Sequence, residues 1–187
     1  TKRRVIVWVH GGGFKGGDRN QGYIVSLSRA FAKKGYVCIA PDYRVRENPA
    51  ADRKGTINDA VNDIYLALEW VIANGKKYHY DPTDIIVGGG SAGGILLNHL
   101  CFGKNDNKIN QRIRAFINLW GSPDNASLYS GIDQDMPPTL IIHGDQDQLV
   151  PFKNSERLSA ALNNAGVYHE LHAFTGAGHT PIDQMDR

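Results

Sequence analysis

Short runs of apolar residues alternate along the chain with longer segments in which apolar residues recur every three or four positions. The amphipathic segments predict helices over Tyr23–Lys34, Thr56–Ala73, Ala92–Phe102 and Phe152–Ala165. Most of the short runs are apolar at nearly every position, as in strands covered on both faces of a parallel sheet. They predict strands over Val5–Val9, Tyr36–Ala40, Asp84–Gly88, Ile113–Trp120, Thr139–His143 and Val167–Phe174.

This alternation predicts an α/β fold, with a mostly parallel central sheet of about six strands and helices on both faces. The 187 residues are a suitable length for a single domain over 1–187. Two stretches, Arg44–Lys54 and Gly121–Met136, show no regular pattern. Both follow the carboxyl ends of predicted strands, where open α/β sheets bind their ligands.

Charge and composition exclude several classes of protein. The 21 basic and 19 acidic residues give a net charge of +2, and no basic block suggests a nucleic-acid partner. No apolar run approaches the roughly 20 residues that span a bilayer. No signal peptide is recognisable, which favours a cytoplasmic location. Cys38 and Cys101 lack metal or redox spacing and are expected to be buried free thiols. His169 and His172 are interpreted as strand side chains, so no metal site is expected.

A glycine-rich turn between a predicted strand and a predicted helix fits two motifs at once. Gly88-x-Gly90-x-x-Gly93 matches a dinucleotide-binding fingerprint, and Gly89-x-Ser91-x-Gly93 matches a nucleophile elbow. In the first motif the turn would bind a pyrophosphate, and in the second it would expose a serine that attacks an acyl group. The turn alone does not distinguish them.

The rest of the chain argues against a nucleotide site and a dehydrogenase. A second fingerprint, Gly11-x-Gly13-x-x-Gly16, is separated from the next helix by Gly17–Gly22, although a pyrophosphate site needs its helix to start on the glycines. Asp42 lies 26 residues past Gly16, rather than about 20. The turn at Gly88 is followed by neither an acid after the next strand nor the lysine of a phosphate-binding loop.

The serine interpretation is supported by three further features. The backbone N–H groups of Gly12, Gly13 and Ala92 are candidates for an oxyanion hole, with His10 bracing the glycine loop. Asp145 or Asp147, after a later strand, can orient a histidine. His179 follows the last strand and completes the order serine, acid, histidine that α/β-hydrolases share.

With these motifs in place, the chain resembles the α/β-hydrolase superfamily, specifically its HGGG-type carboxylesterases. These include the hormone-sensitive-lipase-like enzymes and short bacterial esterases of acylated sugars. The matching motifs run in family order along most of the chain: HGGGF (10–14), PDYR (41–44), GGSAGG (89–94), HGDQDQLVP (143–151) and GAGH (176–179). The resemblance implies Asp147 as the acid of a Ser91–Asp147–His179 triad and Asp145 as a structural residue. It implies no cofactor.

The chain also departs from the family pattern. Two strands that usually precede Val5, a helical cap and a helix after the catalytic histidine are not found. The chain is therefore expected to be trimmed, or to cover its sheet edges with a partner, for example as a dimer. Gly90 replaces the acid that commonly precedes the serine in the hormone-sensitive-lipase branch, which favours the short, capless esterases.

The activity expected from these residues is hydrolysis of a small-molecule ester through an acyl-enzyme. Without a cap the acyl pocket should suit acetyl to butyryl groups. Phe14 and Trp120 are candidates to line this pocket, and the alternative is that both are aromatic residues of the core. Acetylated or feruloylated sugars are candidate substrates. The alternatives are an amide hydrolase of the acylaminoacyl-peptidase or arylformamidase type, and a catalytically inactive binding protein on the same fold.

Overall fold

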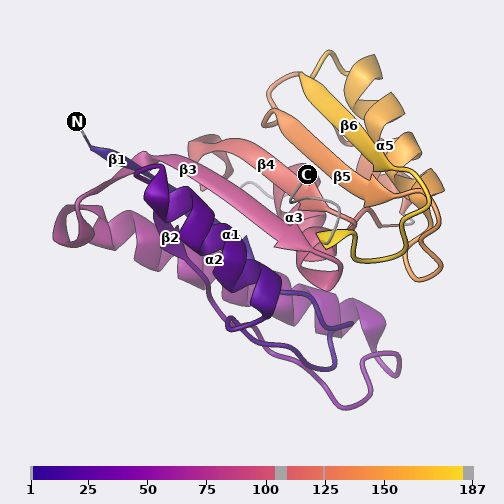
Figure 1. Ribbon diagram of the computed structural model, residues 1–187, viewed down its shortest axis with the longest axis horizontal. Helices are drawn as coiled ribbons and strands as arrows, with labels where there is room; N and C mark the ends of the chain where they lie inside the picture. The colour runs from indigo at the N-terminus through magenta and orange to yellow at the C-terminus, as the bar shows by residue number, and fades with distance from the viewer. Residues whose placement is uncertain (1, 104–108, 124, 183–187) are drawn as a thin grey trace.

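A computed structural model describes residues 2–103, 109–123 and 125–182 (Figure 1). The helices are α1 (Gly22–Lys33), α2 (Arg53–Tyr78), α3 (Ala92–Phe102), α4 (Ala126–Tyr129) and α5 (Phe152–Asn164), with a short 3₁₀ turn at Asn110–Arg112. The strands are β1 (Arg3–Val9), β2 (Val37–Ile39), β3 (Tyr80–Gly90), β4 (Ile113–Leu119), β5 (Thr139–Gly144) and β6 (His169–Phe174).

These strands form one sheet in the order β2-β1-β3-β4-β5-β6, and all of its pairings are parallel. The predicted α/β fold is therefore confirmed. The chain steps outward from β1 to β2, then returns past β1 to β3 and continues in the opposite direction. This reversal makes the carboxyl ends of β1 and β3 the topological switch point, where such sheets bind ligands. The residues that follow these ends are the glycine loop at His10 and the turn at Ser91.

Helices cover both faces of the sheet, as the alternation of side chains along β1 shows. Val5, Val7 and Val9 are fully buried in a core shared with α2, α3 and α5. Ile6 and Trp8 point to the other face and pack with residues of α1. In Figure 1, α1 crosses in front of the sheet and α3 lies behind it. Because both faces of the strand are buried, nearly every position in β1 has to be apolar.

The predicted bounds of the second helix were wrong, since α2 spans Arg53–Tyr78 and not Thr56–Ala73. Its start lies three residues earlier because the side chain of Asp52 accepts a hydrogen bond from the Gly55 N–H at 2.9 Å and caps the helix. Its end lies later because Gly75, which suggests a stop, is buried inside the helix. A Cβ there would lie 2.8 Å from Pro82, so the glycine permits a close contact with β3. Helix α4 likewise lies inside a stretch predicted to be irregular.

Other expectations can be compared with the same structure. Cys101 is buried as predicted, whereas Cys38 is only partly buried; both are free thiols whose pKa burial raises. Within the described ranges there is no group of side chains that could hold a metal ion. None of the described helices combines the length and apolarity needed to cross a bilayer. His169 and His172 lie in β6, where they bond to Ser159 and Glu170.

Candidate active site

The turn between β3 and α3 holds Ser91 in a strained conformation. Its φ of 52° and ψ of −121° lie in a region that side-chain-bearing residues rarely adopt. A Cβ on Gly93 would lie 2.2 Å from the Val9 carbonyl oxygen, and one on Gly89 would lie 2.8 Å from Gly93. Glycine at both positions therefore lets α3 start directly against β1. This geometry is the one that a nucleophile elbow requires.

The structure brings Ser91, His179 and Asp147 together from three separate strand ends. Ser91 Oγ lies 2.8 Å from His179 Nε2. His179 Nδ1 lies 2.7 Å from Asp147 Oδ2. The other carboxylate oxygen of Asp147 accepts bonds from the N–H groups of Leu149 and Val150 at 2.8 and 2.9 Å. The histidine thus faces a hydroxyl on one side and a fixed carboxylate on the other, as a general base requires.

The charge on Asp147 follows from these contacts. Burial alone would raise the pKa of its carboxyl group. The bonds from the Val150 N–H, His179 and the Leu149 N–H outweigh burial, so the pKa of Asp147 lies below its ordinary value. Asp147 is therefore a carboxylate at neutral pH and can stabilise a protonated His179, whose side chain is 18% exposed.

Three unengaged backbone N–H groups lie beside Ser91. Gly12 and Gly13, with φ of 120° and 62°, belong to the loop after β1. Neither of their N–H groups donates a hydrogen bond to any residue that the structure describes. The N–H of Ala92 is at the first position of α3 and has no acceptor within the helix. All three residues line the same cavity as Ser91, which is the arrangement expected of an oxyanion hole.

Buried side chains hold the glycine loop in place. His10 is 1% exposed, donates from Nδ1 to the Gly11 carbonyl at 2.7 Å, and stacks on Tyr43 with 4.3 Å between ring centroids. The Tyr43 hydroxyl donates to the His10 carbonyl at 3.1 Å. His10 therefore braces the loop as predicted. Tyr43 thus holds the glycine loop, whereas the neighbouring Arg44 binds Asp63 of α2 at 2.8 Å.

The absence of an acid before Ser91 has a steric explanation. A Cβ on Gly90 would lie 2.9 Å from the Tyr23 hydroxyl oxygen and 3.2 Å from the Trp120 ring. The Tyr23 hydroxyl accepts a bond from the Gly11 N–H at 2.9 Å. Burial raises the pKa of Tyr23 to about 12, so this group is neutral at physiological pH. Tyr23 thus occupies the space that a side chain at position 90 would need.

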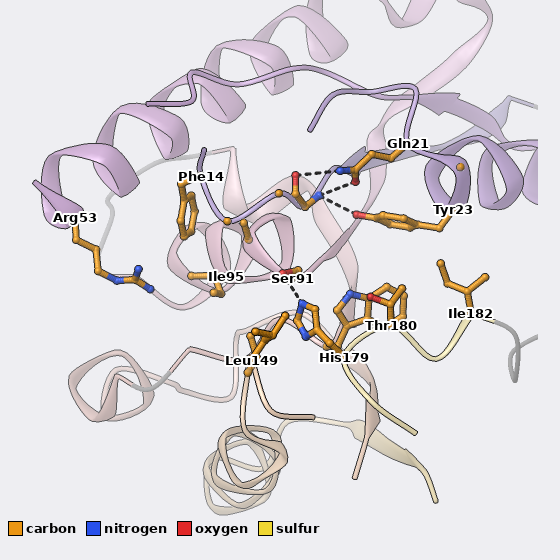
Figure 2. A pocket seen from close by; sticks show the side chains of 17 residues that line it. Phe14, Gln21, Tyr23, Arg53, Ser91, Ile95, Leu149, His179, Thr180 and Ile182 are labelled. Atoms are coloured by element: carbon orange, nitrogen blue, oxygen red, sulfur yellow. Dashed lines mark hydrogen bonds between the residues drawn. The ribbon is translucent and has the colours of Figure 1, made fainter. Parts of the chain in front are cut away.

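Ser91 and His179 open onto a cavity of about 750 Å³ (Figure 2). Phe14 and Trp120 border it, but each is only 2% exposed and belongs to the hydrophobic core as well. Other lining residues were missed because most of them belong to no motif, and because they come from elements distant in the sequence. Figure 2 shows Arg53, from the stretch predicted to be irregular, reaching toward Phe14 and Ile95. The remaining missed residues include Tyr23, Ile95, Leu149, Val150, Thr180 and Ile182.

A second cavity of about 670 Å³ adjoins the first, since Arg53 and Ile95 line both. Its other lining residues are mostly polar or basic, including Lys54, Asn58, His99 and Asn125. Burial, and then the charge of Arg53, lower the pKa of His99. His99 is therefore uncharged at neutral pH, and it presents ring nitrogens that can bond to a polar ligand.

A second serine–histidine–aspartate set shares Asp147 with the first. His143 Nδ1 lies 2.7 Å from Ser155 Oγ, and His143 Nε2 lies 2.9 Å from Asp147 Oδ2. Ser155 and His143 are both fully buried, so neither can meet a substrate. His143 opens the motif HGDQDQLVP, but nothing in the sequence pattern assigns it a role.

Asp145 has a different partner from Asp147. Its carboxylate accepts a bond from the Gly176 N–H at 2.8 Å, which ties the loop before His179 to the loop after β5. This contact agrees with the structural role expected of Asp145.

Comparison with known families supports this description. A family model described as BD-FAE matches residues 1–123 of the chain. The chain belongs to the BD-FAE family. A second model, the Prolyl oligopeptidase family, matches residues 106–186. Together with the fold, these matches place this BD-FAE chain among the α/β-hydrolases.

Individual relatives of this BD-FAE chain are named as esterases. A probable carboxylic ester hydrolase, LipM of Mycobacterium tuberculosis, is 27% identical over 95% of this chain and 52% of its own length. Esterase LipC of the same organism is 28% identical over 94% of this chain and 52% of its own length. The chain thus spans about half the length of these curated relatives.

Solved structures show the same likeness. Thermogutta terrifontis esterase 2, phosphoramylated by tabun, superposes with a TM-score of 0.81 and 28% identity, covering 97% of this chain and 75% of that one. Other structures of this esterase hold propionate or butyrate. The fold of the BD-FAE chain is therefore that of the esterase α/β-hydrolases.

Proposed function

We propose that this chain is a serine carboxylic ester hydrolase in which Ser91, His179 and Asp147 form the catalytic triad. The observation that carries the proposal is the position of Ser91 Oγ, 2.8 Å from His179 Nε2, beside the unengaged N–H groups of Gly12, Gly13 and Ala92. The esterase relatives support the same activity. An inactive binding protein on this fold would not need these groups within hydrogen-bond distance of each other.

The reaction follows from the roles that the geometry allows. His179 takes the proton of Ser91 as Oγ attacks the ester carbonyl, and the three N–H groups stabilise the oxyanion that forms. Asp147 stabilises the protonated His179, which then gives its proton to the leaving alcohol. Water, activated by His179, releases the acid from the acyl-enzyme and restores Ser91.

The first cavity suits a short acyl group. Phe14, Ile95 and Trp120 contribute an apolar part of its lining. Solved structures of Thermogutta terrifontis esterase 2 hold propionate and butyrate, which supports acyl groups of this size here as well. We infer acetyl to butyryl as the preferred range.

The second cavity suits a hydroxylated group attached to the same ester. Asn58, His99 and Asn125 offer hydrogen-bond donors and acceptors directly beside the first cavity. A sugar carries hydroxyl groups that such residues bind. The adjoining cavities therefore support an acylated sugar, with its ester at Ser91.

An amide substrate is the second candidate. The match of residues 106–186 to the Prolyl oligopeptidase family supports it, because this segment contains both Asp147 and His179. The same triad can cleave either bond, so the outcome depends on which substrate the two cavities bind.

The test of the activity uses p-nitrophenyl acetate and a fluorophosphonate probe. Wild-type protein is expected to release nitrophenol and to be labelled at Ser91. Ser91→Ala should lose both, whereas Ser155→Ala, which removes the buried serine, should keep the label. Labelling or hydrolysis that survives Ser91→Ala would refute the proposal.

A substrate panel tests the choice of ester. It compares acetylated sugars, feruloyl esters, p-nitrophenyl esters of increasing acyl length and peptide amides. If the second cavity binds the sugar, His99→Ala and Asn58→Ala should raise KM for an acetylated sugar and leave p-nitrophenyl acetate unaffected. Equal effects on both substrates would contradict this assignment, and faster cleavage of peptide amides would favour the second candidate.

A further inference from the structure

A chain of hydrogen bonds continues from Asp147 into the core through His143. His143 Nε2 lies 2.9 Å from Asp147 Oδ2 and 2.9 Å from the Val150 carbonyl oxygen. Both of these partners are acceptors, because Asp147 is ionised and a carbonyl has no proton to give. His143 Nε2 must therefore carry a proton, which it donates toward the two oxygens.

The other ring nitrogen of His143 has the opposite role. Burial lowers the pKa of His143, against the opposing effects of Asp147 and the Val150 carbonyl, so the ring is neutral at pH 7. The titratable groups near the ring are Asp147 and His179. A neutral ring with a proton on Nε2 has a lone pair on Nδ1, which accepts the hydroxyl proton of Ser155 at 2.7 Å.

The hydrogen bonds beyond Ser155 have the same donor-to-acceptor direction. Because the Ser155 hydroxyl already donates its hydrogen bond to His143, Ser155 Oγ must accept a hydrogen bond from the Ser122 hydroxyl at 2.7 Å. Ser122 Oγ accepts from Asn118 Nδ2 at 3.1 Å. The Asn118 amide is oriented by its other atom, Oδ1, which accepts from the Gly121 N–H at 3.0 Å. Every donor in this buried series therefore points toward Asp147.

We propose that His143 is a positioning residue for Asp147: its neutral, Nε2-protonated ring fixes the carboxylate in front of His179 and draws part of its negative charge away from His179. This rests on the proposed function for its kinetic consequences. On the side away from Asp147, the hydrogen bonds of Ser155, Ser122 and Asn118 fix the tautomer of His143. Asp147 Oδ2 is then shared by two N–H donors, His143 Nε2 at 2.9 Å and His179 Nδ1 at 2.7 Å.

Kinetic measurements compare His143→Leu with His143→Gln. The leucine has a similar volume and no donor, whereas the amide nitrogen of glutamine can replace Nε2. Loss of one hydrogen bond to a charged group predicts that His143→Leu lowers kcat about 10- to 100-fold with little change in KM. His143→Gln should recover most of this loss.

The pH profile separates positioning from a general loss of structure. Without the His143 donor, Asp147 keeps more of its charge for His179 and favours the protonated base. The acid limb of kcat/KM should therefore move to higher pH in His143→Leu and return toward the wild-type position in His143→Gln. An equal loss of activity at every pH, or a limb that moves to lower pH, would overturn the proposal.

A second measurement does not depend on activity. Long-range proton–nitrogen correlation spectra of the ¹⁵N-histidine-labelled full chain report the tautomer of each ring. His143 should be neutral and protonated on Nε2 from pH 6 to pH 8, and the His179 Nδ1–H signal should shift in His143→Leu. A charged His143, or one protonated on Nδ1, would refute the proposal. If the predicted tautomer is found in a protein without esterase activity, the proposed function fails instead.

Discussion

Two aspartates only two residues apart, Asp145 and Asp147, show how side chains of one type acquire different roles. The residues alone left both open as the partner of a histidine, and family resemblance favoured Asp147. In the structure Asp147 is buried and contacts His179 at 2.7 Å, whereas Asp145 bonds to the Gly176 backbone at 2.8 Å. The partner that each carboxylate meets, His179 or the Gly176 N–H, therefore decides its role.

Substitution of each aspartate by asparagine should separate these roles. Asp147→Asn is expected to lower kcat by up to about 10,000-fold, since the histidine loses its orienting charge and its tautomer. Asp145→Asn, the matched control, should mainly lower the melting temperature. Ester hydrolysis and thermal melts measure the two effects, and an exchange of the two results would exchange the assignments.

The lowered pKa of Asp147 also predicts how stability depends on pH. Because the folded-state pKa lies below the unfolded one, Asp147 stabilises the fold above about pH 4 and loses this contribution as the pH falls toward the folded value. Urea denaturation from pH 7 to pH 3 checks this. The stability difference between wild type and Asp147→Asn should shrink in the acid range, and a difference that grows there would contradict it.

In the segment formed by β3, the turn and α3, the glycines determine the local structure but not the chemistry. The same spacing fits a nucleotide fingerprint and a nucleophile elbow, because both bring a helix N-terminus close to a strand. In this chain Gly89 and Gly93 face backbone atoms of β1 and α3, while Ser91 and His179 line the same cavity. The element itself was predictable from its pattern, but its chemistry depends on the elements around it.

Alanine substitutions test this packing. Gly93→Ala would place a Cβ 2.2 Å from the Val9 carbonyl oxygen, so it should destabilise the fold by several kcal/mol or prevent folding. Gly22→Ala, at the start of α1, meets nothing within 4 Å and should be neutral or stabilise by about 0.4–1 kcal/mol. Chemical denaturation of both variants measures the difference. Similar stabilities would show that α3 does not pack as closely as described.

At the scale of the whole molecule, the site joins two parts of the sheet. Ser91 and the candidate oxyanion hole follow the ends of β1 and β3 and include the first residue of α3, while Asp147 and His179 follow β5 and β6. The sheet also ends in two unlike edge strands. β6 carries the exposed side chains of Glu170 and His172, which discourage pairing with another chain. β2 has only the apolar residues Val37–Ile39.

The dimer suggested by the sequence stays a prediction, and β2 is the edge better suited to form it. Pairing through a three-residue strand offers few hydrogen bonds, so any such dimer should be weak. Sedimentation velocity over a range of concentrations should show a sedimentation coefficient that rises with concentration. A single monomeric species throughout would rule this edge out as an interface.

The order of apolar runs and amphipathic segments determined the α/β class, because burial on both faces of a parallel sheet leaves a strong local pattern. Motif order along the chain also singled out Ser91, Asp147 and His179. Tertiary structure decided the rest. The entry of Arg53 and Tyr23 into the cavity, the full length of α2 and the buried series behind His143 all depend on contacts between distant segments. Such contacts leave no period or spacing in the sequence.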